Sequence, residues 1–345
     1  MKSQLLTLVM LCVMTTLTAQ IKIDSTFSIS GSADMYFRTN VNSTNDFSEA
    51  DLGATLAPAT SFANLPGFSM GMFNLIGNYE GKKVGFTADL VFGPRGADAV
   101  FGSTGSANIV NQLFGYWNVT DKFKLTLGNF NTFLGYEVIS ATLNFNYSTS
   151  YMFSYGPFSH AGLKADFELG EGFTGMVGVF NETDATEFSL GGDFVGGAQL
   201  GYSNDKGGAW LNFILADGFY QVDLTTGWQA TEKFYVGLNA TSAQEAFYGA
   251  ALYLQVAATD ALSLGIRGEY FADENEDLEN QIVGGKDENV IDVTLSANYK
   301  IGNLTIIPEV RLDKFSSDMV YPDGFDLTKT QDNLTSFLLA AVYSF

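Results

Sequence analysis

Ser159 and His160 are the residues of this chain that come nearest to a catalytic nucleophile and its base. His160 is the only histidine of the chain. A Ser–His hydrolase needs the two side chains to be brought together by the fold with an acid, and neighbouring positions in the sequence do not supply that geometry. A lone histidine also argues against a multi-histidine metal site. A hydrolase built on these two residues is therefore the less favoured alternative to a chain without catalysis.

An acidic segment near residue 275 resembles the beginning of a calcium-binding loop. Asp273, Asn275, Asp277 and Glu279 supply oxygen ligands at alternate positions. The pattern then fails, because Leu278 stands where glycine is required and no glutamate follows at the twelfth position. We interpret the segment as a solvated acidic loop, and the alternative of a bound cation stays open.

The segment Gly170 to Gly175 matches the dinucleotide fingerprint G-x-G-x-x-G. That fingerprint binds a cofactor only where it joins a strand to a helix. Here it joins two predicted strands, so it predicts a tight turn, and no cofactor is expected.

The balance of charge excludes nucleic acid as a partner. The formal net charge is -21, with 38 acidic and 17 basic residues. Binding to phosphate backbones needs clustered lysine and arginine. An acidic interior or acidic external loops are the better interpretations of this excess.

The N-terminus resembles a secretory signal peptide. Lys2 gives the positive start, residues 5–13 give an apolar core, and small and polar residues lead to cleavage after Ala19. Leu17 departs from the pattern, since a small residue is preferred there, and a short buried element is the alternative. The only cysteine, Cys12, lies inside this segment without the small residue usually expected before a lipoprotein cysteine. The expected domains are a signal at 1–19 and a single domain over 20–345.

The elements that must position the polar residues are strands. Outside the N-terminus there is no run of about 20 apolar residues, which excludes a helical membrane protein. Apolar and polar residues alternate with period two, most clearly over 262–270 and 291–299. Sixteen such segments are predicted, at 26–39, 69–80, 83–92, 109–119, 122–130, 160–168, 172–180, 193–203, 208–216, 219–229, 233–242, 246–258, 261–271, 288–301, 304–315 and 333–345.

The connections between these segments alternate between short turns and long loops, with exceptions at 217–218 and 243–245. The long connections are 40–68, 93–108, 131–159, 181–192, 272–287 and 316–332. This alternation is typical of an outer-membrane barrel, which has short periplasmic turns and long external loops. The sequence therefore predicts an all-β fold, a transmembrane antiparallel up-and-down β-barrel of about 16 strands.

Aromatic residues on the apolar phase gather near the short turns and at the C-terminus. They are Tyr79, Phe123, Phe167, Phe173, Tyr202, Trp228, Phe234, Tyr299 and Phe345. Such a ring is typical of the aromatic girdle at a membrane interface. Phe345, the last residue, is expected to be the outward terminal aromatic of the closing strand.

A barrel of sixteen strands is wide enough to leave an aqueous channel. The polar phase of the predicted strands then faces the lumen. The candidates for lining it are Asp34, Arg38, Asp89, Lys164, Asp166, Asp223, Arg267, Glu269, Glu309, Arg311 and Asp313.

Residues 128–167 are similar to a known family signature. The similarity rests on Gly128, Phe130, Gly135-Tyr136-Glu137, Asn144, Asn146-Tyr147-Ser148, Pro157 and His160-Ala161-Gly162. In these positions the chain resembles the OmpL-like β-barrel porin family of Gram-negative outer membranes. The resemblance implies a diffusion porin without catalytic residues.

Loop 131–159 is too long for a simple connection, and its aromatic and asparagine residues would allow it to pack inside the lumen. The candidates for narrowing the pore are Tyr136, Glu137, Asn144, Asn146 and Tyr147. The alternative is an external loop that covers the rim.

We expect passive diffusion of small hydrophilic solutes or ions, with a weak preference for cations, because carboxylates on the polar phase would attract them. Neither an enzyme activity nor a cofactor is expected. The expected surroundings are outer-membrane lipid, with a homo-oligomer left open. The alternative in another class is a structural or partner-binding barrel without an open pore.

Overall fold

The computed structural model describes residues 21–22, 26–46, 57–62, 65–189, 191–276, 281–317, 321–323 and 326–345. The predicted signal at 1–19 lies outside the described residues, as do Asp277, Leu278 and Glu279 of the acidic segment.

Sixteen antiparallel strands form one closed barrel in this part of the chain, which confirms the predicted fold class and strand number. The strands are β2 (Phe27–Asn40), β3 (Gly67–Glu80), β4 (Val84–Phe92), β5 (Val110–Thr120), β6 (Phe123–Asn131), β7 (Ser159–Gly170), β8 (Phe173–Phe180), β9 (Val195–Asn204), β10 (Gly207–Ala216), β11 (Phe219–Gln229), β12 (Phe234–Ala243), β13 (Phe247–Ala257), β14 (Leu262–Asp273), β15 (Asn289–Ile301), β16 (Leu304–Phe315) and β19 (Asn333–Ser344). Their bounds agree with the sequence predictions to within the one or two residues by which strand ends are usually uncertain.

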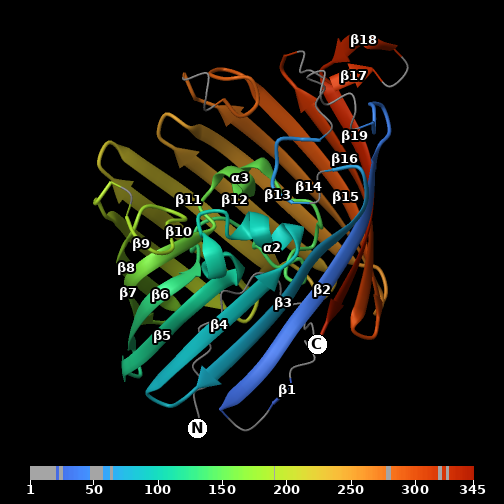
Figure 1. Ribbon diagram of the computed structural model, residues 1–345. Helices are drawn as coiled ribbons and strands as arrows, with labels where there is room; N and C mark the ends of the chain where they lie inside the picture. The colour runs from blue at the N-terminus through green and yellow to red at the C-terminus, as the bar shows by residue number, and fades with distance from the viewer. Residues whose placement is uncertain are drawn as a thin grey trace.

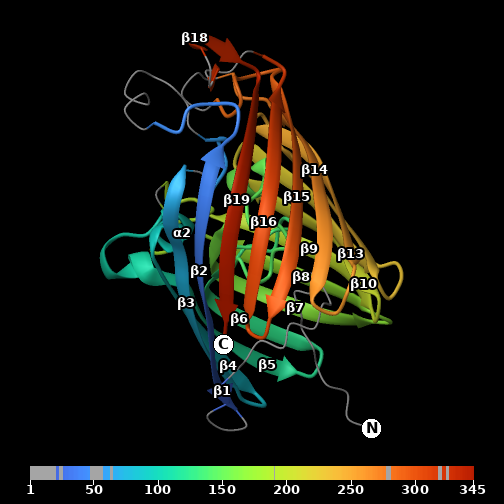
Figure 2. The same ribbon diagram turned by 90° about the vertical axis from the view of Figure 1, so that its right-hand side faces the viewer.

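Each strand pairs with its neighbours in the sequence, and β19 pairs with β2 to close the barrel. The register of this closure runs from Ser336 opposite Asn40 to Ser344 opposite Ser32. Figures 1 and 2 show the strands tilted around the wall, with the C-terminus at the end that carries the short turns.

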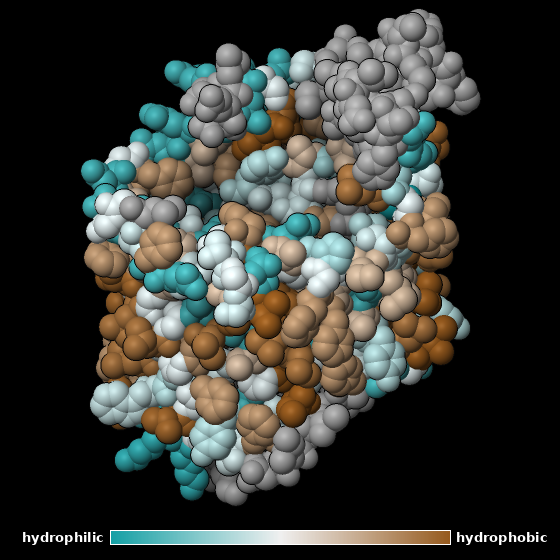
Figure 3. Space-filling view, in the orientation of Figure 1, coloured by the Kyte–Doolittle hydropathy of each residue, from teal (hydrophilic) through white to brown (hydrophobic). Residues whose placement is uncertain are grey.

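Burial alternates along the strands as expected for a wall with one polar and one apolar face. In β15, Asp292 and Thr294 are fully buried on the inner face, whereas Ile291 and Leu295 are 48% and 53% exposed on the outer face. Figure 3 shows apolar side chains over a broad zone of the visible outer face, with hydrophilic residues mostly toward its two ends.

The turn between β7 and β8 explains the glycine pattern at 170–175. Gly170, Glu171 and Gly172 all have positive φ, of 96°, 54° and 85°. This left-handed backbone suits glycine, and it confirms that the segment is a turn between two strands.

The structure also contains small elements that the sequence patterns did not predict. They are β1 (Ile21–Lys22), α2 (Pro94–Ala99), the 3₁₀ helix η1 (Gly105–Ile109), α3 (Tyr151–Tyr155) and the hairpin of β17 (Tyr321–Asp323) and β18 (Asp326–Gln331). Among the described residues, none of the helices has the length and apolar character needed to cross a membrane.

Candidate functional site

The connection between β6 and β7 lies inside the barrel, where Figure 1 shows α3 surrounded by strands. We call residues 132–158 the inner loop. Its aromatic residues Tyr147 and Tyr151 have no exposed side-chain surface. The short helix begins at Ser150, whose side chain accepts a hydrogen bond from the Phe153 amide at 3.1 Å. Such a cap satisfies one of the free amides at the start of a helix.

Two wall carboxylates each accept two backbone amides of the inner loop. Glu269 on β14 accepts from Tyr151 and Met152, both at 2.8 Å. Glu309 on β16 accepts from Tyr147 at 2.9 Å and from Ser148 at 3.2 Å. Each of these two glutamates thus satisfies two neighbouring amides, and together they fix the backbone of the loop to one side of the wall.

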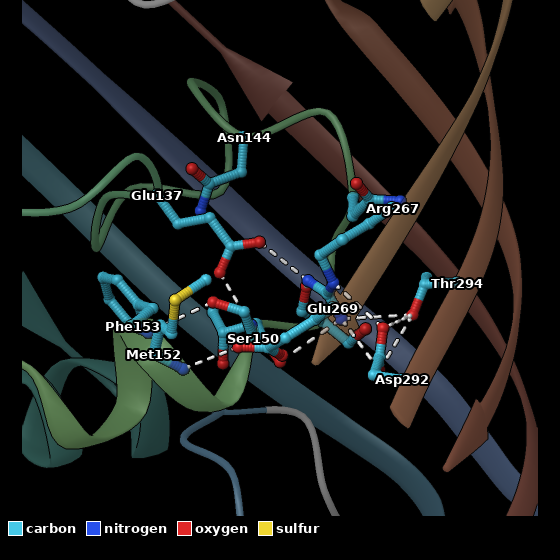
Figure 4. A network of polar contacts seen from close by, with 12 residues as sticks. Glu137, Asn144, Ser150, Met152, Phe153, Arg267, Glu269, Asp292 and Thr294 are labelled. Atoms are coloured by element: carbon cyan, nitrogen blue, oxygen red, sulfur yellow. Dashed lines mark hydrogen bonds and ion pairs between the residues drawn. The ribbon is translucent and has the colours of Figure 1, made fainter. Parts of the chain in front are cut away.

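Two wall arginines donate hydrogen bonds to the inner loop, to its backbone carbonyl groups and to the side chain of Glu137. Arg267 donates to Glu137 at 2.7 Å and to the Ser148 carbonyl at 2.8 Å, and Figure 4 shows this cluster. Arg311 donates to the Thr149 carbonyl at 2.7 Å. These are buried, charge-assisted contacts, and removing one partner would leave an unpaired charge.

Asp292 on β15 joins the two arginines. Its carboxylate lies 3.2 Å from Arg267 and 2.7 Å from Arg311, and Arg311 also pairs with Asp313 at 2.7 Å. The ion-paired cluster therefore has two arginines and three acidic groups, with Glu137 from the loop as one of its members.

The adjoining strands β12 and β13 hold the beginning of the inner loop by an aromatic contact. The ring of Tyr136 stacks on Tyr253 with centroids 3.9 Å apart, and its hydroxyl donates to the Tyr235 hydroxyl at 3.2 Å. Gly237 on β12 makes the approach possible, because a Cβ there would lie 2.5 Å from the Tyr136 ring. The adjacent Gly135 amide donates to Asp223 on β11 at 3.0 Å.

A third attachment joins the loop to the closing region of the barrel. The Tyr147 hydroxyl donates to Asp34 on β2. Burial, followed by the neighbouring Asp34 carboxylate, raises the pKa of the Tyr147 phenol, so this hydroxyl stays protonated and available as a donor.

The eleven residues named as lumen-facing candidates all lie on the inner side of the wall, in two groups. One group is buried at 4% exposure or less, much of it directly against the inner loop: Asp34, Arg38, Asp89, Asp223, Arg267, Glu269, Glu309, Arg311 and Asp313. The other group, Lys164 and Asp166, keeps about a fifth of its side-chain surface exposed and forms an ion pair at 3.0 Å.

The five candidates on the loop have different surroundings. Tyr136, Glu137 and Tyr147 contact the wall as described above. Asn146 donates to Ser296 on β15 at 2.8 Å. Asn144 binds within the loop itself, to the Val138 amide at 3.0 Å and to its carbonyl.

Three residues that matter here were not among the sequence candidates. Asp292 could have been found, because it lies on the polar phase of a clear strand. Lys124 on β6 lies 3.6 Å from Asp166, and it too could have been found, because it lies on the polar phase of a predicted strand. Arg95, in the short helix α2 after β4, donates to the Ile139 carbonyl at 3.0 Å and lies 4.5 Å from the Phe62 ring centroid. Its position follows no strand periodicity, so no sequence pattern pointed to it.

Two of the cavities that the described residues enclose between the inner loop and the wall are large enough to hold several waters. The larger, of about 220 Å³, is lined by polar and aromatic residues of β5 to β11, including Lys124, Lys164 and Trp210. The smaller, of about 160 Å³, lies against β2 to β6. Asn131 lines both.

His160 and Asp273, considered above for catalysis and for calcium binding, both make contacts that hold the fold together. His160 is fully buried, with ring centroids of Phe133 and Phe180 at 4.9 Å and 5.1 Å, and its Nε2 lies 3.0 Å from the Thr132 hydroxyl. Asp273 accepts the backbone amides of Val283 and Gly285 at 3.0 Å each, and so orders its own loop. Within the described residues, no group of three or more histidine, cysteine or acidic side chains is arranged to hold a metal ion.

Solved structures of similar fold are outer-membrane channels. The channel DcaP of Acinetobacter baumannii matches with a TM-score of 0.58 at 11% identity, over 92% of this chain and 97% of that chain. The anion-selective porin of Comamonas acidovorans matches with a TM-score of 0.56 at 11% identity, over 93% and 100%. OmpT of Vibrio cholerae, in a trimer form, matches with a TM-score of 0.55 at 13% identity, over 93% and 99%. At these identities the similarity establishes the fold alone.

A search of curated protein sequences gave no match. The family comparison is more specific. The model described as "Putative beta-barrel porin-2, OmpL-like" matches residues 26–345, which is nearly the whole chain and includes the signature at 128–167. The chain therefore belongs to the OmpL-like β-barrel porin family, whose members are outer-membrane channels.

Proposed function

We propose that this porin lets small hydrophilic solutes and ions diffuse passively past the inner loop. The observation that carries the proposal is the attachment of that loop across the barrel interior, with cavities left between the loop and the wall. A loop held by Glu269, Glu309 and Arg267 would narrow the pore without filling it, and its fixed position would set a size limit for solutes.

The proposal includes a weak preference for cations. Acidic side chains outnumber basic ones on the described inner wall, but most of them already bind the loop or an arginine. Acids paired with an arginine add little to the potential that a passing ion meets, and acids bound to the neutral donors of the loop keep their charge but are buried. The remaining contribution comes from groups that border the cavities, among them Asp89, Asp166 and Lys164.

Three further parts of the proposal concern the surroundings of the barrel. Residues 1–19 would be a cleaved export signal, which supports delivery to the outer membrane. The long loops would face outward and the short turns the periplasm. A homo-oligomer is proposed by analogy with the trimer form of the Vibrio protein.

We also propose that the chain is not an enzyme. The enclosure of His160 by Phe133 and Phe180 supports this, because a general base must reach its substrate. The partner-binding barrel without a pore is the remaining alternative.

The test is single-channel recording in a planar bilayer with the purified full-length barrel. We expect stepwise conductance from the wild type. In Glu269→Gln the carboxamide would place an N–H group against one of the two loop amides, which should loosen the loop, since an unsatisfied buried donor costs about 1–3 kcal/mol. The conductance should therefore become larger or noisier than in the wild type.

Glu232→Gln is the matched control, because Glu232 is exposed in the β11–β12 turn, lines neither cavity and should leave the conductance unchanged. A folded wild type without conductance would contradict the channel and favour the partner-binding barrel. Conductance that Glu269→Gln does not alter would contradict the narrowing role of the loop.

A further inference from the structure

The larger cavity lies on the side of the inner loop that faces the short turns. Its lining extends from residues 120–122, in the turn between β5 and β6, to residues 132–135 of the inner loop, and its volume is about 220 Å³. A solute that crosses the barrel in either direction would therefore pass its side chains. What they can bind follows from an aromatic ring and an ion pair in the lining.

The indole of Trp210 on β10 lies flat against the wall of this cavity. Its direct neighbour on β9 is Gly201, and Gly208 precedes it by two positions on the same face of β10. A Cβ at Gly201 would lie 2.6 Å from the indole Cδ1, and a Cβ at Gly208 would lie 2.6 Å from its Cη2. The ring thus fills the space that two side chains would otherwise occupy. Trp210 lines the cavity and these two glycines do not, so one face of the indole covers the wall and the other is turned toward the lumen.

Polar groups with unused hydrogen-bonding capacity surround this ring. Gln199 donates to the Asn212 carbonyl oxygen at 2.7 Å, and Asn212 in turn donates to Asp223 at 2.8 Å. These two bonds fix the orientation of the Gln199 amide, so its carbonyl oxygen is the free end. Within the described residues, the Gln199 carbonyl oxygen, the Thr174 hydroxyl and the indole N–H of Trp210 have no hydrogen-bond partner. All three belong to half-buried side chains that line the cavity, and each of the three atoms keeps accessible surface.

An ion pair of β6 and β7 also lines the cavity. Lys164 donates to Asp166 at 3.0 Å, and Lys124 lies 3.6 Å from the second oxygen of the same carboxylate. The three side chains keep 20–22% of their surface exposed. A lysine ammonium has three N–H groups, and Lys164 uses one of them for Asp166, so donors remain available to a solute.

Basic and acidic groups are balanced in the lining. It contains Lys122, Lys124 and Lys164 together with Asp121, Asp166 and Glu168. The remaining charged residue of the lining, Glu137, is paired with Arg267. A simple cation or anion would therefore meet like charges as well as opposite ones, and the cavity has no single sign of charge with which to select it.

We propose that this cavity is a binding site for a neutral sugar, a mono- or disaccharide whose ring stacks on Trp210. The free groups beside the indole include both donors and acceptors, and a sugar hydroxyl both donates and accepts. The apolar C–H face of a pyranose packs on an aromatic ring, while its hydroxyls would bind groups such as Gln199 and Thr174. The inference rests on the proposed channel, because it names one class of solute that the lumen would hold.

The test is saturation-transfer NMR on the full folded barrel, with glucose and maltose as probes. The micelles are formed by an amine-oxide detergent, because maltoside detergents would themselves present sugars. We expect a saturable transfer of magnetisation from the barrel to the sugar, strongest at the C–H protons of one ring face. Binding should be weak, because a solute that is to pass must also leave. Sorbitol, an acyclic polyol without a ring face, should give no saturable signal.

Trp210→Ala removes the stacking surface. It should raise the half-saturating sugar concentration by about tenfold or more, because truncating an aromatic anchor is among the costliest changes at a binding surface. Trp117→Ala is the matched control, because Trp117 is 51% exposed on the outer face of β5 and does not line the cavity, and it should bind like the wild type. Gly201→Ala keeps the tryptophan but places a Cβ against its ring, so it should weaken binding as well.

Sugar binding that does not saturate would overturn the proposal. So would binding that is unchanged in Trp210→Ala or, should that variant not fold, in Gly201→Ala. Tighter binding of glucuronate than of glucose would also overturn it, because the lysines would then form a site for carboxylates.

These measurements need no conduction. A barrel that conducts ions but binds no sugar would therefore refute only this inference. A barrel that binds sugar but conducts no ions would instead contradict the proposed channel and leave the binding site standing.

Discussion

At the scale of single residues, a glycine on the wall decides how closely the inner loop can approach. A Cβ at Gly237 would lie 2.5 Å from Tyr136, well inside contact distance. We expect Gly237→Ala to push the Tyr136 ring off Tyr253. Overpacking of this kind costs about 1–3 kcal/mol, so the urea midpoint of the folded barrel should fall and the inner loop should become more sensitive to protease.

Gly268→Ala is the control for this prediction. Gly268 also lies in a strand, but a Cβ there would meet no atom within 4 Å. Alanine has less backbone freedom to lose than glycine, so this variant should be neutral or slightly stabilising. Equal behaviour of the two variants would show that the contact between Gly237 and Tyr136 does not hold the loop.

Single residues also show what the sequence could and could not reveal about the site. Alternation along a strand gives the face of Glu269 and Arg267, because period two requires no knowledge of the partner. It does not give their function. The partners are backbone groups of the inner loop, more than a hundred residues away in the sequence, and no local pattern encodes a contact between an amide and a distant carboxylate.

At the scale of elements, the last residue completes the junction between β19 and β2. Phe345 and Gly31 exchange two backbone hydrogen bonds, at 2.9 Å and 3.0 Å. The Phe345 ring covers Gly31, where a Cβ would lie 2.7 Å from it, and stacks near Phe73 at 6.3 Å. An open edge in a membrane leaves backbone groups unpaired, which is strongly unfavourable.

We therefore expect deletion of Phe345 to lower the amount of folded barrel in the outer membrane. The measurement is the heat-modifiable band on a gel of outer-membrane fractions, compared with the wild type. Phe345→Tyr keeps the ring and the backbone bonds and should insert normally. Undiminished insertion of the deleted chain would mean that the pairing of the other β19 residues is sufficient for closure.

The end of the barrel that carries the long loops contains a carboxyl group that should make stability depend on pH. Asp184, in the loop after β8, accepts the amides of Phe158 and Ser159 at 2.8 Å each. Burial raises its pKa to about 6, although these two amides act in the opposite direction. The folded state thus binds the proton more tightly than the unfolded state, whose carboxyl has its ordinary pKa near 3.8.

The sign of the effect follows from this difference. Stability should fall as pH rises from about 4 to about 6, and should not change further through this group above pH 6. Asp184→Asn should remove that part of the pH dependence, as measured by unfolding temperatures of wild type and variant across the range. Glu187→Gln, at an exposed position of the same loop, is the control. Parallel curves for wild type and Asp184→Asn would refute the prediction.

The elements differ in how far the sequence determines them. The long strands could be predicted because their two faces meet different solvents, and this imposes alternation over many residues. The helices α2 and α3 are one or two turns long, too short to be stable alone. α3 forms where Ser150 caps it and Glu269 binds its first amides, so its existence depends on tertiary contacts that the sequence pattern does not contain.

At the scale of the whole molecule, the strongly acidic composition does not translate into a strongly acidic pore. Arg267 and Arg311 compensate part of the charge of the three acids with which they pair, Glu137, Asp292 and Asp313. In the larger cavity Asp166 lies between two lysines, Lys124 at 3.6 Å and Lys164 at 3.0 Å. The charges that a passing ion meets are therefore few and partly compensated, which is why only a weak cation preference is expected.

The last prediction changes this balance at Lys164. Lys164→Gln leaves Asp166 with a single lysine, so the potential in the larger cavity should become more negative and the cation preference should increase. The measurement is the reversal potential across a potassium chloride gradient in a planar bilayer. The difference from the wild type should shrink at high salt, because the Debye length falls from about 8 Å at physiological ionic strength to about 3 Å at 1 M.

Lys83→Gln, at an exposed turn position, should leave the reversal potential unchanged. If the wild type prefers anions at low salt, then Lys124 and Lys164 dominate the narrowest part of the pore, and the proposed selectivity has the wrong sign.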